Sequence, residues 1–104
     1  MKAEFSFSKD HPSIAGHFPG EPIIPGVTLL VRIQEVIHVS IDPGEIYRLR
    51  SAKFLHPVKP GEHLKISWEK GVSGDLSFHC AIRDVPVLTG IFSLLKTLGR
   101  PEHA

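Results

Sequence analysis

The sequence contains a single cysteine, Cys80, among its 104 residues. One cysteine cannot form an internal disulfide bond or supply the ligands of a cysteine-based zinc cluster. The chain also has no apolar run near the roughly 20 residues that a membrane-spanning helix needs. Its first eight residues, MKAEFSFS, lack the apolar centre of a signal peptide. These absences predict a reduced, cytoplasmic protein.

A strong charge of one sign is missing as well. Twelve Lys and Arg residues stand against eleven Asp and Glu residues, so the net charge is +1 with the seven histidines neutral. A general nucleic-acid binder carries a stronger basic excess, so nucleic acid is not an expected partner. A membrane is not expected either, because the chain lacks a long apolar run. Hydrophobic residues make up 41% of the chain, which is typical of a folded protein. At this length we expect one domain over residues 1–104.

Alternating apolar and polar side chains predict an antiparallel sheet. The alternation over 46–58 is blurred, which indicates a bulge. Residues 87–96 are apolar on both faces, as in a strand inside a sheet or one covered by a partner. Trp68 and Phe78 are expected in the core. The predicted strands are 2–8, 46–58, 63–69, 76–83 and 87–96.

Residues 9–26 contain four prolines and three glycines, which exclude a regular element there and indicate an ordered loop. The period then becomes helical over 27–39, with Arg32 and Glu35 on the polar face. The apolar face consists of Leu29, Leu30, Ile33, Val36 and Ile37. We therefore expect an α+β fold in which one sheet curls around one helix. Its exposed sheet edge favours a dimer.

His17 lies in this loop, shortly before the predicted helix. The first amide groups of a helix are unpaired and carry partial positive charge. A histidine base beside such donors suits the removal of a proton next to a carbonyl group. The residues alone leave a second interpretation open, in which His17 packs within the loop and hydrogen-bonds to a backbone carbonyl.

The segment GHFPGEPIIPGV, residues 16–27, resembles the signature of the bacterial 3-hydroxyacyl-ACP dehydratases. A second stretch, AKFLHPVKPGE over 52–62, is similar to another motif of that family. The short chain most resembles the ApeI-like, dehydratase-like members. This resemblance implies the hotdog fold, a curved antiparallel sheet wrapped around one central helix, and a homodimer or a heterodimer with another hotdog subunit. It implies no cofactor, and an acyl carrier protein that presents the acyl thioester for fatty acid or polyketide biosynthesis.

The resemblance also assigns roles to residues of this chain. The family's histidine removes the α-proton of a 3-hydroxyacyl thioester, and a backbone amide at the helix start binds the thioester carbonyl. Carried over to this sequence, the base is His17 and the amide belongs to Gly26. The residues expected to contact the substrate are Phe18, Pro25, Val27 and Val31.

Val31 departs from the family pattern, because it occupies the position of a helix carboxylate that serves the departing hydroxyl group from the other subunit. Valine cannot transfer a proton, and losing a general acid costs about 10²–10⁴-fold in rate. Glu35, one helical turn later, could take over the role, or it could be a solvated or dimer-rim charge. Alternatively, a different hotdog subunit supplies the carboxylate, or the protein is an impaired subunit that pairs with an active dehydratase.

The resemblance leaves a third functional class open, an acyl thioesterase. Hotdog thioesterases also commonly use a helix carboxylate, so Val31 weakens this alternative as well. A run of basic residues would favour docking of an acidic carrier protein, or would simply form a solvated sheet face. The residues of this run are Arg48, Arg50, Lys53, Lys59 and Lys65. The histidines show no metal-ligand spacing, so no metal is expected.

Overall fold

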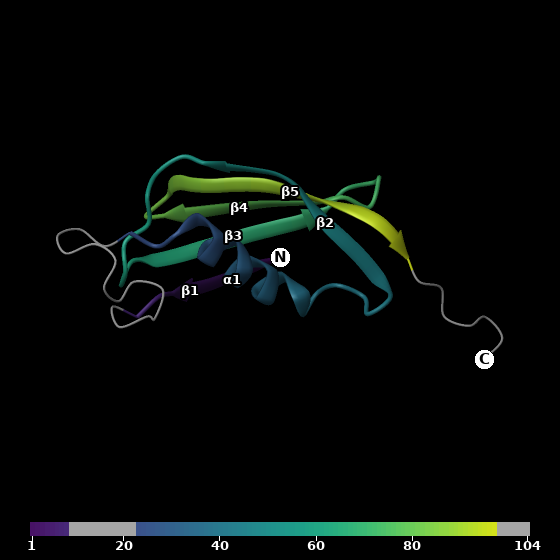
Figure 1. Ribbon diagram of the computed structural model, residues 1–104, viewed down its shortest axis with the longest axis horizontal. Helices are drawn as coiled ribbons and strands as arrows, with labels where there is room; N and C mark the ends of the chain where they lie inside the picture. Colours follow the sequence, from purple (N-terminus) through teal and green to yellow (C-terminus); the bar gives the residue numbers. More distant parts are fainter. Residues whose placement is uncertain (9–22, 98–104) are drawn as a thin grey trace.

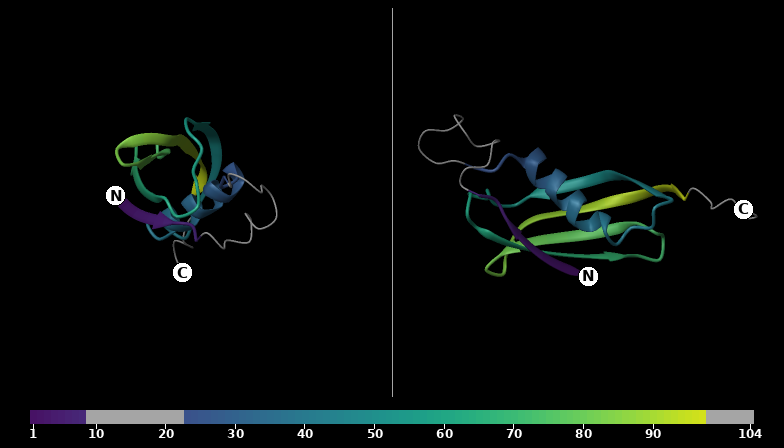
Figure 2. Two further views of the ribbon diagram at one scale, coloured as in Figure 1. Left: turned by 90° about the vertical axis from the view of Figure 1, so that its left-hand side faces the viewer. Right: turned by 90° about the horizontal axis from the view of Figure 1, so that it is seen from below.

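A computed structural model describes residues 1–8 and 23–97, and these residues form one helix and one five-stranded antiparallel sheet. The strand order is β1-β3-β4-β5-β2, and the sheet is strongly curved with α1 on its concave side (Figures 1 and 2). This agrees with the predicted sheet curled around one helix. The elements are β1 (Lys2–Ser6), α1 (Gly26–His38), β2 (Glu45–Phe54), β3 (His63–Lys70), β4 (Leu76–Ile82) and β5 (Val85–Thr97).

Helix α1 begins at Gly26, one residue before the predicted start, and its burial follows the predicted stripe. Leu29, Ile33 and Ile37 are buried against the sheet, whereas Arg32 and Glu35 on the opposite face are exposed. At the other end of the helix, the Ser40 hydroxyl donates a 2.8 Å hydrogen bond to the carbonyl of Ile37. Helix α1, the one helix in the described part of the chain, is not long and apolar enough to cross a membrane.

The core fills the space between α1 and the concave face of the sheet. Alternate residues of β3 and β4 point into it, among them Trp68 at 7% exposed and Phe78 at 0%, as predicted for both side chains. The indole N–H of Trp68 donates a 2.8 Å hydrogen bond to the hydroxyl of Ser40. This bond satisfies the one polar atom of the indole ring and ties the end of the helix to the sheet.

The two strands with unusual patterns behave as their sequences indicate. Strand β2 shows two register shifts against β5, at Ile46/Tyr47 and at Leu49/Ser51, which confirms the predicted bulge. Strand β5 lies between β4 and β2, which agrees with the prediction of a strand inside the sheet.

Strand boundaries differ from the predicted ones for local reasons. Arg83 and Asp84 both have positive φ angles, 49° and 67°, so a tight two-residue turn lets β5 begin at Val85 rather than at residue 87. Strand β2 ends at Phe54, and the predicted strand residues 55–58 instead form an irregular segment. The predicted loop over residues 9–26 falls largely outside the described residues, and so do His17 and Phe18.

Gly90 provides a test of how tightly the sheet packs. A Cβ at this position would lie 2.4 Å from Cζ of Phe78 and 2.6 Å from the carbonyl oxygen of Ser51. We expect Gly90→Ala to lower the free energy of unfolding by about 1–3 kcal/mol through overpacking, measured by urea denaturation. The control is Gly71→Ala, where the nearest atom is 3.8 Å away, and its change should stay within about 0.5 kcal/mol. Equal effects of the two variants would contradict this packing.

Candidate active site

The start of α1 carries a backbone donor that has no acceptor among residues 1–8 and 23–97. The residue before the helix is Pro25, with φ −58° and ψ 144°, and no side chain caps the helix there. The Pro25 carbonyl accepts hydrogen bonds from the amides of Thr28 and Leu29, at 3.0 and 3.1 Å. Among the described residues, none accepts a hydrogen bond from the amide of Gly26. This N–H therefore combines an open donor with the partial positive charge of a helix N-terminus.

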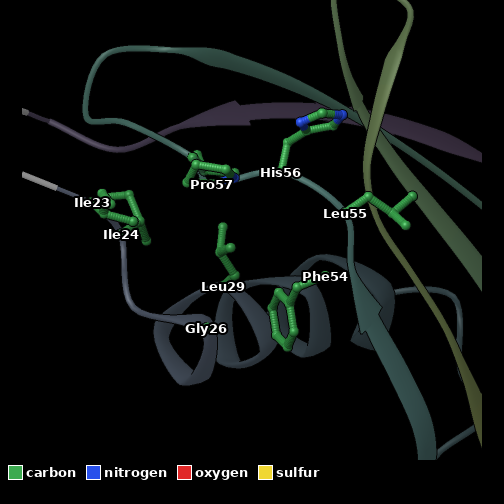
Figure 3. A pocket seen from close by; sticks show the side chains of 9 residues that line it. Ile23, Ile24, Gly26, Leu29, Phe54, Leu55, His56 and Pro57 are labelled. Atoms are coloured by element: carbon green, nitrogen blue, oxygen red, sulfur yellow. The ribbon is translucent and has the colours of Figure 1, made fainter.

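An open cavity of about 390 Å³ lies beside Gly26 (Figure 3). It is bounded by the first turn of α1 and by the irregular segment that follows β2. The amide of Ile24 donates a 2.8 Å hydrogen bond to the carbonyl of Val58, which holds these two walls together. The lining residues are Ile23, Ile24, Gly26, Leu29, Phe54, Leu55, His56, Pro57 and Val58.

The walls of this cavity are mostly apolar. Figure 3 shows the side chains of Leu29 and Phe54 at the cavity, whereas the imidazole of His56 points away from α1. The cavity thus joins an apolar surface to the open amide of Gly26. This combination suits an apolar molecule that carries one carbonyl oxygen, because the amide can hydrogen-bond to that oxygen.

Phe54 packs directly against Gly26. A Cβ added at Gly26 would lie 2.8 Å from Cζ of the Phe54 ring, so only glycine allows this approach without a shift of the ring. The ring remains 49% exposed. Sequence reasoning did not assign Phe54 to the site, although it lies within the second motif. Phe54 contacts Gly26 because β2 ends beside α1. The sequence pattern of either segment alone does not predict this contact.

Val31 lies on the exposed side of α1, where its side chain is 50% exposed, and Val27 is 69% exposed. Val31 and Glu35 line a second cavity, of about 340 Å³, between the helix and the end of β1. Gly26 does not line this cavity. Within the described part of one chain, the two carried-over positions therefore face different cavities. The residues around the second cavity are Ser6, Phe7, Ser8, Thr28, Val31, Arg32 and Glu35.

The basic run does not form one patch. Lys65 lies on β3, near the β1 edge of the sheet, whereas Arg48, Arg50 and Lys53 lie on the edge strand β2. Arg50 is partly engaged by Asp75, at 3.4 Å. Lys53 and Lys59 are exposed and flank the segment that lines the Gly26 cavity.

Within residues 1–8 and 23–97, His56 is the one titratable side chain that lines the Gly26 cavity. Burial raises the pKa of the Cys80 thiol to about 12, so this group stays protonated and is not a nucleophile at neutral pH. No group of three or more His, Cys, Asp or Glu residues in the described ranges is placed to hold a metal ion.

Comparison with known proteins gives the same family as the motifs. The family model described as ApeI-like, ApeI dehydratase, matches residues 1–91. The 3-hydroxyacyl-[acyl-carrier-protein] dehydratase FabZ of Klebsiella pneumoniae subsp. pneumoniae is 32% identical over 82 residues, which are 67% of this chain and 54% of that protein. The chain thus spans about half the length of the curated relatives it matches.

Two solved structures resemble the fold closely. One is the dehydratase heterocomplex ApeI:P from Xenorhabdus doucetiae, with a TM-score of 0.73 and 23% identity, covering 91% of this chain and 86% of that one. The other is an uncharacterized protein from Erwinia carotovora subsp. atroseptica, with a TM-score of 0.77 and 22% identity, covering 89% and 80%. At these identities the likeness shows the fold alone, which is the expected hotdog fold.

Proposed function

We propose, on the premise that the chain belongs to the ApeI-like dehydratase family, that it takes part in the dehydration of 3-hydroxyacyl thioesters held on an acyl carrier protein. The observation that carries this proposal is the open amide of Gly26 at the head of an apolar cavity of about 390 Å³. An acyl thioester needs these two features, a donor for its carbonyl oxygen and an apolar surface for its chain.

The reaction divides between a base and an oxyanion donor. His17 removes the α-proton, and the negative charge that develops on the carbonyl oxygen is stabilised by the N–H of Gly26. The C–O bond at the β-carbon then breaks, and the hydroxyl group leaves with a proton as water. The product is a 2-enoyl thioester. Phe18, Pro25, Val27 and Val31 are proposed to contact the acyl group.

Donation of a proton to the leaving hydroxyl group is the step for which this chain lacks the family's usual residue. Val31 cannot donate it, and Glu35 is the nearest carboxylate on the same exposed side of α1. Because the family's carboxylate comes from the other subunit, a partner hotdog subunit that has this carboxylate would supply it beside His17 and Gly26. The similarity to a subunit of a dehydratase heterocomplex favours a partner of this kind.

The carrier protein would dock beside the Gly26 cavity. Acyl carrier proteins are acidic, and Lys53 and Lys59 place positive charge on both sides of the segment that lines the cavity. Complementary charge of this kind raises the rate of association more than the final affinity. We therefore assign these two lysines to the docking surface.

Removing the base tests the central assignment. We expect His17→Ala to lower dehydration of a short 3-hydroxyacyl-ACP by about 10²–10⁴-fold, because the variant lacks the group proposed to remove the α-proton. Formation of the conjugated enoyl product by the purified protein measures this. Release of free acid instead of an enoyl product would indicate a thioesterase, and undiminished dehydration in the variant would refute the role of His17.

Gly26 allows the amide itself to be tested with a matched pair of variants. Gly26→Ala keeps the N–H, whereas Gly26→Pro removes it, and both add a Cβ beside Phe54. Proline is tolerated at the first position of a helix, and the extended Pro25 backbone suits a following proline. We expect kcat of the proline variant to fall about 10²–10³-fold below that of the alanine variant. Equal rates would exclude the Gly26 amide as the oxyanion donor.

Restoring a carboxylate tests the missing acid. If the protein pairs with itself and only lacks an acid, Val31→Glu should raise turnover by up to about 10²–10⁴-fold. Glu35→Gln is the companion variant, because it removes a carboxylate without changing side-chain size. Loss of activity in Glu35→Gln, with no gain in Val31→Glu, would assign the acid to Glu35. If neither variant changes turnover, the acid comes from a partner subunit, and activity should then depend on adding that subunit.

A further inference from the structure

The ring of Phe54 is the wall of the Gly26 cavity that lies against the start of α1. Phe54 is the last residue of β2, and Gly26 is the first residue of the helix. Apart from the helix backbone and the two neighbouring residues, the three described atoms nearest to a Cβ placed on Gly26 all belong to this ring. They are Cζ at 2.8 Å, Cε1 at 3.1 Å and Cε2 at 3.4 Å. The far edge of the ring therefore faces the residue that carries the open amide.

This contact places the ring beside any carbonyl group that the Gly26 amide binds. In standard backbone geometry a Cβ lies about 2.5 Å from the amide nitrogen of its own residue, so Cζ of Phe54 is no more than about 5.5 Å from the Gly26 nitrogen. A carbonyl oxygen that accepts a hydrogen bond lies about 2.9 Å from that nitrogen. The α-carbon of an acyl group is bonded to the same carbonyl carbon. A substituent on this α-carbon is therefore within reach of the ring.

The backbone around Phe54 holds the ring in this position. Phe54 pairs with Leu88 of β5, which is fully buried. The amide of the next residue, Leu55, donates a 2.9 Å hydrogen bond to the carbonyl of Val87. The point from which the ring extends is thus fixed to β5, although the ring itself is 49% exposed. A wall held in this way resists the insertion of an extra methyl group.

The size of the cavity as a whole does not restrict a short acyl chain. An apolar cavity of about 150 Å³ holds benzene, and the cavity beside Gly26 has about 390 Å³ and is open. The restriction is local to the ring of Phe54. It therefore acts on branching next to the carbonyl group and not on the length of a short chain.

We propose that Phe54 determines the specificity of the site by excluding acyl thioesters that carry a substituent on the α-carbon. The inference rests on the proposed function, in which the Gly26 amide binds the thioester carbonyl. A methyl group on the α-carbon would overlap with the ring. It leaves one α-proton in place, so the chemistry of dehydration is still available to the branched substrate. The substrate class is then the 3-hydroxyacyl thioesters that are unbranched at the α-carbon.

Phe54→Leu tests the ring directly, because leucine is apolar and lacks the three ring atoms that approach Gly26. The value of kcat/KM is measured for 3-hydroxybutyryl-ACP and for 2-methyl-3-hydroxybutyryl-ACP. One methyl group in an apolar pocket changes kcat/KM by about 10–200-fold, and we expect the wild-type protein to favour the unbranched substrate by such a factor. In Phe54→Leu this ratio should fall at least about tenfold.

Leu55→Ala is the control for the ratio. Leu55 lines the same cavity, but none of its atoms is among the three nearest to the Cβ position of Gly26. Loss of its side chain should affect both substrates alike, so the ratio should stay within about twofold of the wild-type value. If Phe54→Leu does not fold, Phe54→Met replaces it. The flexible methionine side chain moves aside more easily than the ring, and the ratio should fall here as well.

A binding measurement separates this inference from the proposed reaction. Pantetheine analogues of the two acyl groups, with an amide in place of the thioester, are titrated into the wild-type protein and Phe54→Leu, and backbone amide shifts are followed by NMR. We expect the unbranched analogue to bind the wild-type protein more tightly and the preference to be lost in the variant. If this is seen without turnover of either thioester, the role of Phe54 stands and the proposed dehydration fails.

Two results would overturn the role of Phe54. One is a wild-type protein that turns over or binds the branched and unbranched compounds equally well, or binds neither up to its solubility limit. The other is a preference that persists in Phe54→Leu at the wild-type ratio. Either result combined with dehydration of the unbranched thioester would leave the proposed function in place and remove only the selection by the ring.

Discussion

The packing of one helical stripe on the concave side of the sheet is the interaction on which the rest of the structure depends. Leu29, Ile33 and Ile37 are almost fully buried there, and the curved sheet closes around them. Because these contacts fix the helix along its length, both of its ends are held at definite places beside β2. Each end then meets a different part of that strand, Phe54 at the start of the helix and Tyr47 at its end.

This arrangement gives the two ends of the helix different chemistry. At the start, an open amide with partial positive charge faces apolar walls, which suits a carbonyl group attached to an apolar chain. At the end, polar side chains are paired across the chain, because Trp68 donates a hydrogen bond to Ser40 and Glu45 binds Lys70.

The exposed face of the helix poses a different problem. Val27 and Val31 are largely exposed although they are apolar, and the adjoining edge strand β2 has no further described strand beside it. Both features are typical of a surface that another subunit covers. A partner on this face would bring its own residues to the cavity beside Val31 and Glu35.

The sequence by itself determined the elements and the family. Alternation with a period of two reports which strand face is buried, and the apolar stripe of 27–39 reports the helix, because both depend on neighbours along the chain. The segment over 16–27 likewise carried the resemblance to the dehydratases. Only the tertiary structure decided that Phe54 packs on Gly26 and that Trp68 hydrogen-bonds to Ser40. Those contacts join residues far apart in the chain, and their geometry depends on sheet curvature and on the bulges of β2, which no local pattern encodes.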